Sequence, residues 1–148
     1  MKDITVSAAI INLDDKILIC QRKADDRKHP LKWEFPGGKA EAGEAADESL
    51  VRELQEELGI QVLEQKLIMN YRVQYEESPP IHLYFYAVSE YLSTVKNRVF
   101  NEIRWVTLKE LGHYDFLEGD RRIVEALIHR DVLLQNACLD CSLKQIFQ

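Results

Sequence analysis

The chain has 148 residues, of which 46% are hydrophobic and 30% charged, and its net charge is −6. This length suits one globular domain with a sizeable core. The negative charge argues against general affinity for polymeric nucleic acid, which is itself a polyanion. No apolar run is long enough to cross a bilayer, and the first residues do not resemble a signal peptide. Together with an odd number of cysteines, three, these features predict a cytoplasmic protein that does not enter membranes.

Hydrophobic periodicity predicts the order of the secondary-structure elements. In chain order these are strands at residues 4–13, 16–23 and 33–35, a helix at 45–58, strands at 63–75, 81–91 and 102–106, and a helix at 119–130. Strands interrupted by two helices, without regular alternation, indicate the α+β class. We expect one domain over residues 1–148, with a core at 1–130 and a C-terminal extension at 131–148.

The first predicted helix has an apolar stripe. Leu50, Leu54 and Leu58 recur every four residues, so we expect them to face the core with Val51 beside them. Gly59 follows directly and suits a helix C-terminus, where a left-handed residue is preferred.

The same helix carries three carboxylates, Glu53, Glu56 and Glu57. Residues three and four apart share a helix face, where like charges repel by roughly a few tenths of a kcal/mol per pair. We expect these side chains on an exposed rim, where a divalent cation would offset the repulsion. Magnesium takes oxygen ligands and often combines one or two carboxylates with substrate phosphates. The cluster therefore predicts a metal site, with Arg52 neutralising a neighbouring carboxylate.

The segment before the helix reads Glu34-Phe35-Pro36-Gly37-Gly38-Lys39, a short apolar strand that runs into a glycine loop. Gly37 and Gly38 permit close approach of the main chain to a ligand, and Lys39 offers a positive charge to phosphate. Arg22 and Lys23, at the end of the second predicted strand, are further candidates for contact with phosphate or base. Arg27 and Lys28 are expected in a solvated loop.

Residues 38–60 resemble the signature of the Nudix hydrolases at every defining position. These positions are Gly38, Glu44, Arg52, Glu53, Leu54, Glu56, Glu57, Gly59 and Ile60. The flanking run at residues 32–39 resembles the MutT-like branch, which comprises small nucleoside triphosphate pyrophosphohydrolases that remove damaged or unwanted nucleotides. The resemblance implies the Nudix α-β-α sandwich, with a mixed central β-sheet and the signature loop-helix.

The resemblance also implies a reaction. A nucleoside or deoxynucleoside triphosphate would be hydrolysed to the monophosphate and pyrophosphate with Mg²⁺, for which Mn²⁺ can substitute. Glu53, Glu56 and Glu57, with the carbonyl of Gly38, would hold the metal, and one glutamate, Glu53 in first place, would act as base. Glu44 would brace Arg52. The partner is then the nucleotide, and the protein is expected to be a monomer or a homodimer.

Substrate choice rests on Asp120, which matches the base-reading position of MutT-like proteins. An aspartate accepts hydrogen bonds from an exocyclic amine such as that of cytosine, but it also suits a helix N-cap, and both readings stay open. Phe35 is expected to stack on the base, from the strand face that it shares with Trp33. The candidate substrates are cytosine nucleotides and 8-oxo-dGTP.

Two alternatives stand beside this reading. One is hydrolysis of another nucleoside diphosphate-linked compound, such as a dinucleoside polyphosphate or a nucleotide sugar. The other is a non-catalytic nucleotide-binding module, which the retained glutamates disfavour.

Two segments depart from a simple match. Many relatives carry a further glutamate before the last strand, where this chain has Val99. Glu102 either reaches in from nearby to replace it or is an exposed strand residue, in which case the base role falls to the signature helix. In the tail, Cys138 and Cys141 form a single Cys-x-x-Cys, for which packing is a better reading than a redox or zinc site. Residues 131–148 either continue the second helix or form an amphipathic helix at a dimer contact.

Overall fold

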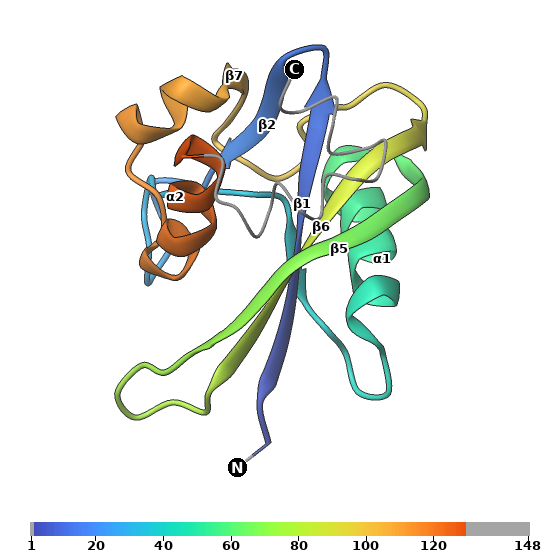
Figure 1. Cartoon of the computed structure of the whole chain (residues 1–148). Coiled ribbons are helices and arrows are strands. Elements are labelled where there is room, and N and C mark those ends of the chain that lie inside the picture. Colours follow the sequence, from blue (N-terminus) through green and yellow to red (C-terminus); the bar gives the residue numbers. More distant parts are fainter. Residues whose placement is uncertain (1, 130–148) are drawn as a thin grey trace.

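The computed structural model describes residues 2–129 (Figure 1). Its elements are β1 (Ile4–Leu13), β2 (Lys16–Gln21), β3 (Trp33–Glu34), β4 (Gly37–Lys39), α1 (Ala46–Leu58), β5 (Gln61–Val73), β6 (Ile81–Leu92), β7 (Glu102–Thr107), the 3₁₀ segments η1 (Leu108–His113) and η2 (Glu118–Asp120), and α2 (Arg121–His129). No helix within this part of the chain is both long and apolar enough to span a membrane.

The strands form a mixed sheet in the order β3-β2-β1-β6-β5, with β4 paired to β1 and β7 paired to β2. β1 and β6 run parallel from the pair Ile4–Ile81 to the pair Ile11–Val88. The other pairings are antiparallel. One strand, β1, therefore pairs with β6 along one edge and with β4 and then β2 along the other. The predicted mixed sheet is confirmed.

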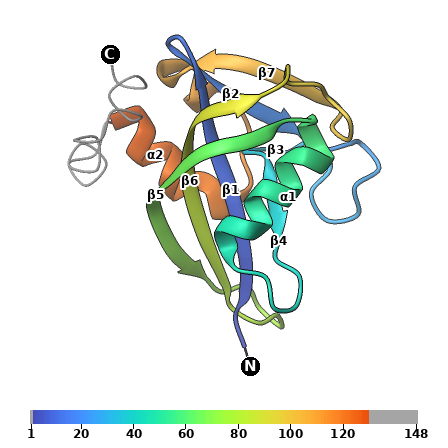
Figure 2. The ribbon, with the colours of Figure 1, turned by 90° about the vertical axis from the view of Figure 1, so that its right-hand side faces the viewer.

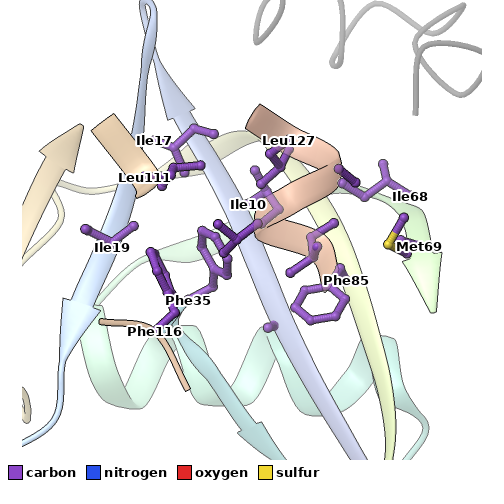
Figure 3. Close-up of a cluster of buried hydrophobic side chains, with 14 of the residues drawn as sticks. Ile10, Ile17, Ile19, Phe35, Ile68, Met69, Phe85, Leu111, Phe116 and Leu127 are labelled. Carbon is purple, nitrogen blue, oxygen red and sulfur yellow. The ribbon is translucent and has the colours of Figure 1, made fainter. Parts of the chain in front are cut away.

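Two apolar layers cover the two faces of this sheet, because successive residues of a strand point to opposite sides. Ile10 of β1 lies in the cluster that includes Leu127 of α2, whereas Ile11 lies in the cluster that includes Leu54 of α1. Figure 2 shows the two helices on opposite sides of the sheet, and Figure 3 shows Ile10, Phe85 and Leu127 gathered under α2. The predicted sandwich is confirmed.

Helix α1 buries Leu50, Leu54 and Leu58 completely, as the four-residue spacing predicts. Val51 was expected beside this stripe but is 36% exposed, so that part of the prediction is wrong. One residue is a 100° rotation on a helix, which carries Val51 out of the contact with the sheet. Gly59 ends the helix in the left-handed conformation (φ 69°), as predicted.

The structure also corrects several element bounds. The predicted glycine loop contains a strand, β4, because Gly37 and Gly38 pair with Ala8 and Ser7 of β1. The second helix starts at Arg121 rather than at residue 119, since residues 118–120 form the 3₁₀ segment η2. β2 ends at Gln21, so Arg22 and Lys23 belong to the loop that follows. The predicted extension at 131–148, with its cysteine pair, lies outside the described residues.

Candidate active site

The main cavity, of about 540 Å³, lies between β1, β4 and the η2 turn. Its polar lining includes Arg22, Glu34, Gly37, Gly38, Lys39, Glu57 and Asp120. Its apolar lining includes Val6, Val73, Tyr75, Ile81, Leu83 and Leu117. The cavity therefore offers both charged groups for a polar ligand and apolar surface for a ring.

A smaller depression, which we call the side hollow, has a volume of about 310 Å³. It is lined by Arg22, Lys23, Asp25, Asp26, Glu34, Glu57, Val99 and Phe100. Arg22, Glu34 and Glu57 line both spaces. These three side chains are thus the wall between the main cavity and the side hollow.

The signature loop lies against the helix through contacts that require glycine. Gly37 has φ 151°, and a Cβ there would lie 2.0 Å from the carbonyl oxygen of Ser7 on β1. A Cβ on Gly38 would lie 2.6 Å from the carboxylate of Glu53. We expected the two glycines to let the main chain approach a ligand, whereas the close approaches that the structure shows are to β1 and to Glu53. This arrangement also leaves the Gly37 amide free to donate to Glu57 Oε1 at 2.9 Å.

Arg52 joins the acidic side chains of the signature. It donates to Glu44 at 2.8 and 2.9 Å, to Glu53 at 2.8 Å and to the carbonyl of Lys39 at 3.2 Å. It also reaches Glu56 at 3.3 Å. The hydrogen bond from Arg52 lowers the pKa of Glu44 to about 2. The predicted bracing of Arg52 by Glu44 is what the geometry shows.

The three glutamates of α1 have different surroundings, so the prediction of one exposed rim is wrong. Glu56 is exposed, whereas the side chains of Glu53 and Glu57 are largely covered by the glycine loop. Burial raises the pKa of Glu57 to about 8, against the lowering effect of the Gly37 amide, and the charges of Glu53 and Glu34 add to the rise. Burial also raises the pKa of Glu53, although Arg52 opposes this shift.

The chemistry of these side chains fits a hard cation, but the glutamates would have to move before they could bind it. Within residues 2–129, no three acidic, histidine or cysteine side chains converge closely enough to hold a metal ion as they stand. Arg52 draws Glu53 and Glu56 to itself, while Glu57 faces the Gly37 amide. The donors are all oxygens, and the raised pKa of Glu57 marks a carboxyl that lacks a balancing positive charge. Ligation by these glutamates and the Gly38 carbonyl stays a prediction.

Sequence reasoning missed Glu34. This carboxyl lies on the wall between the two spaces and accepts a hydrogen bond from Arg22 Nη1 at 3.1 Å. Burial raises its pKa to about 7, while Arg22 acts in the opposite direction. The available signal was a charged residue inside an apolar strand, between Trp33 and Phe35, on the face opposite to both.

Asp120 lies at the end of the η2 turn and is buried in the lining of the main cavity. Burial raises its pKa to about 8, the charge of Glu34 adds to the rise, and the Phe35 backbone amide lowers it as a hydrogen-bond donor. The turn is held by Tyr71, whose hydroxyl donates to the carbonyl of Gly119 at 2.6 Å. Asp120 therefore precedes α2, as a cap would, but its carboxyl interacts across the cavity with β3 and its flank.

Phe35 and Trp33 were expected to share one face of their strand, with Phe35 stacking on the base. Phe35 and Trp33 belong to the same core cluster, and Phe35 also lines the main cavity. However, Phe35 stacks on Phe116 with ring centroids 5.3 Å apart and meets Phe85 edge-on. Its ring is thus chiefly part of the core, and only its cavity side is available to a base.

The basic candidates divide between the two spaces. Lys39 lines the main cavity, Lys23 lines the side hollow, and Arg22 lines both. Arg27 and Lys28 are exposed in the following loop, as predicted. Arg22 is paired with Asp26 and Glu34, so much of its charge is already balanced.

Val99 stands at the position where many relatives carry a further glutamate. It lines the side hollow together with Glu57. Glu102 does not reach either space. It lies on β7 opposite Gln21 and forms an ion pair with Arg104. Among the described residues that line the side hollow, the nearby carboxylates are instead Asp25, Asp26 and Glu34.

Comparison with known protein families gives a match to the NUDIX domain over residues 1–127. The match covers both helices except for the last residues of α2, and it includes every site residue described above.

Individual proteins agree with the family match. The CTP pyrophosphohydrolase of Escherichia coli K12 is 35% identical over 128 residues, which cover 86% of this chain and 93% of that protein. The 8-oxo-dGTP diphosphatase of Haemophilus influenzae is 30% identical over 128 residues, covering 86% and 93%. Among solved structures, the E. coli ORF135 protein superposes with a TM-score of 0.77 at 33% identity, covering 89% of this chain and 93% of that one.

Proposed function

Since the chain belongs to the NUDIX domain family, we propose that it releases pyrophosphate from a nucleoside triphosphate and prefers a cytosine nucleotide. The reaction yields the nucleoside monophosphate, and its role is to remove unwanted nucleotides from the precursor pool. The similarity to a CTP pyrophosphohydrolase supports the base. The similarity to 8-oxo-dGTP diphosphatases supports the reaction class.

The buried carboxyl of Asp120 is the observation that favours cytosine over guanine. Burial raises its pKa to about 8, which favours the protonated form near neutral pH. A neutral carboxylic acid both donates and accepts a hydrogen bond. The Watson–Crick edges of cytosine and adenine each present an acceptor nitrogen beside an amine donor, which is the complementary pair. Between these two bases, the similarity to a CTP pyrophosphohydrolase favours cytosine. Guanine and 8-oxoguanine present two adjacent donors there, which suit an ionised carboxylate instead.

The two parts of the main cavity then have separate tasks. The apolar side chains would hold the base against Asp120, and the end with Gly37, Gly38 and Lys39 would hold the phosphates. Mg²⁺, bound by Glu53, Glu56 and Glu57, would supply charge neutralisation at the phosphoanhydride. Arg52 and the Gly37 amide would keep the carboxylates beside the glycine loop, from which their side chains would have to turn to bind the metal.

A substrate panel tests this proposal. CTP, dCTP, 5-methyl-dCTP, dATP, dGTP and 8-oxo-dGTP are compared for release of pyrophosphate or phosphate, with Mg²⁺, with Mn²⁺ and with a chelator. A nucleotide sugar and a dinucleoside polyphosphate are included. We expect pyrophosphate, the highest kcat/KM with a cytosine nucleotide, and no turnover in chelator.

The possible failures are distinct. Preference for 8-oxo-dGTP would contradict the role given to neutral Asp120 while leaving the reaction class intact. Turnover of the nucleotide sugar or the dinucleoside polyphosphate alone would replace the substrate class. Binding of nucleotides without turnover of any of them would leave a binding module.

A further inference from the structure

Asp26 is an organising residue that neither the family signature nor the proposed reaction uses. Its Oδ1 accepts hydrogen bonds from the backbone amides of Lys28 at 3.1 Å and His29 at 2.8 Å. Its Oδ2 accepts two hydrogen bonds from Arg22, at 3.1 Å from Nε and 2.8 Å from Nη2. Oδ1 thus binds the loop backbone, and Oδ2 binds Arg22, which belongs to the wall between the main cavity and the side hollow.

Arg22 is held on both sides. Asp26 takes its Nε and Nη2, and Nη1 donates to Glu34 at 3.1 Å. A guanidinium has five N–H groups, so the three bonds leave two N–H groups for a ligand. Because Arg22 lines both the main cavity and the side hollow, these free groups are available where the two spaces meet.

The loop itself closes on the same residues. The amide of Arg22 donates to the carbonyl of Lys32 at 2.9 Å, and the amide of Asp26 donates to the carbonyl of Lys23 at 3.2 Å. His29 and Lys32, from the far side of the loop, also line the main cavity. Fixing Asp26 therefore fixes Arg22 and the edge of the cavity together.

We propose that Asp26 is a positioning residue for nucleotide binding: it holds the guanidinium of Arg22 between the main cavity and the side hollow, ready to donate to the phosphates of the substrate. An arginine side chain loses considerable rotamer freedom when it is immobilised, and a side chain that is already held avoids that loss on binding. This inference rests on the proposed function, since the ligand is the nucleoside triphosphate.

The test separates the two oxygens of Asp26. Asp26→Asn keeps an oxygen that accepts from the loop amides but loses the charge that pairs with Arg22, whereas Asp26→Ala loses both. With CTP and Mg²⁺, we expect Asp26→Asn to raise KM by about three- to tenfold with kcat within about twofold, a size set by the immobilisation of one side chain. Asp15→Asn, in the β1–β2 turn, is the charge-matched control and should match the parent.

A double-mutant cycle identifies the route of the effect. If Asp26 acts through Arg22, then Asp26→Asn should have no further effect on KM in an Arg22→Ala background. Binding of α,β-methylene-CTP, measured by calorimetry, should show the same non-additive pattern without any turnover. Equal effects of Asp26→Asn in the two backgrounds would overturn the inference. So would a normal KM for Asp26→Asn beside a raised KM for Asp26→Ala, which would mean that only the loop contacts matter.

Failure of the proposed function gives a different result. A parent protein that releases no pyrophosphate from any nucleoside triphosphate would refute that function before any variant is compared. An active parent whose KM is unchanged by Asp26→Asn would refute this inference alone.

Discussion

Glu57 is the signature carboxylate with the clearest structural setting for catalysis. It is the one glutamate of α1 that lines both spaces, and the Gly37 amide fixes its Oε1. Glu53 contacts Gly38 and Arg52 instead. The sequence placed the catalytic base first at Glu53 because of the resemblance. The structure adds the orientation that a sequence cannot supply.

We therefore expect Glu57→Gln and Glu53→Gln each to lower kcat by about 100- to 10,000-fold, the range for loss of a metal ligand or acid–base group. Steady-state release of pyrophosphate at saturating Mg²⁺ measures this. The exposed Glu64 on β5 gives a matched control, and Glu64→Gln should retain the parental kcat. Parental turnover in folded variants at both catalytic positions would refute the metal site.

Val99 permits a gain-of-function test. It is 44% exposed and lies beside Glu57 in the side hollow, so a longer polar side chain fits there without burial. Val99→Glu adds a carboxylate to the side hollow, which Asp25, Asp26, Glu34 and Glu57 already line. The Mg²⁺ concentration for half-maximal activity should fall several-fold, and Val99→Gln should leave it unchanged. An equal response of the two variants would show that charge in the side hollow does not reach the metal.

The Asp120 carboxyl predicts a pH-dependent base preference. Its pKa is raised to about 8, so the neutral acid dominates at pH 6.5 and the carboxylate dominates above pH 8.5. The ratio of kcat/KM for CTP to that for dGTP should fall severalfold across this interval. Asp120→Asn carries no such proton, and its ratio should stay constant. A ratio in the parent that is flat with pH would remove the argument for cytosine.

At the scale of elements, periodicity predicted most strands and both helices because it reports which side chains face a core. It failed where a backbone contact decides the structure. β4 has no apolar alternation, and only its pairing with Ser7 and Ala8 makes it a strand. The start of α2 was similarly misplaced, because η2 is held by the distant Tyr71. Neither contact leaves a local sequence signal.

Because of the β1–β4 pairing, alanine substitutions at two glycines with positive φ should cost very different amounts of stability. Gly37→Ala would place its Cβ 2.0 Å from Ser7 O, so we expect a loss of roughly 3 kcal/mol or more in the free energy of unfolding. Gly43→Ala, at φ 80° with no atom within 4 Å, should lose only about 1 kcal/mol from backbone strain. Urea unfolding measures both. Equal losses would mean that the tight contact with β1 is not required.

At the scale of the whole molecule, three acids from distant elements meet in the lining of the main cavity. Glu34, Glu57 and Asp120 have pKa values raised to about 7, 8 and 8. The sequence showed an acidic protein but not this concentration, because Glu34 and Asp120 are 86 positions apart and meet only through the fold. A carboxyl whose pKa is raised by folding binds its proton more tightly in the folded state than in the unfolded state.

The raised pKa of Asp120 makes the folded state less stable as pH rises. Asp120, whose ordinary pKa is 3.8, contributes stability that is complete below that pH and is lost as pH rises through about 8. In chelator, the melting temperature should therefore fall between pH 5 and pH 9. Asp120→Asn should recover roughly 1–2 kcal/mol at pH 8.5, since no charge has to be buried. Calorimetry at several pH values tests this, and an identical pH dependence for parent and variant would contradict it.

The stretch from Trp33 to Lys39 is fastened at both ends, to β2 through β3 and to β1 through β4, and only Phe35 and Pro36 separate the two strands. Glu34 stands on one side of that bridge, and Gly37 and Gly38, which we propose face the phosphates, stand on the other. The spacing between the Glu34 carboxyl and the two glycines is thus set by a two-residue span. A single inserted residue there would shift one of the two strands out of register, so this stretch can vary by exchanged side chains but not by added length.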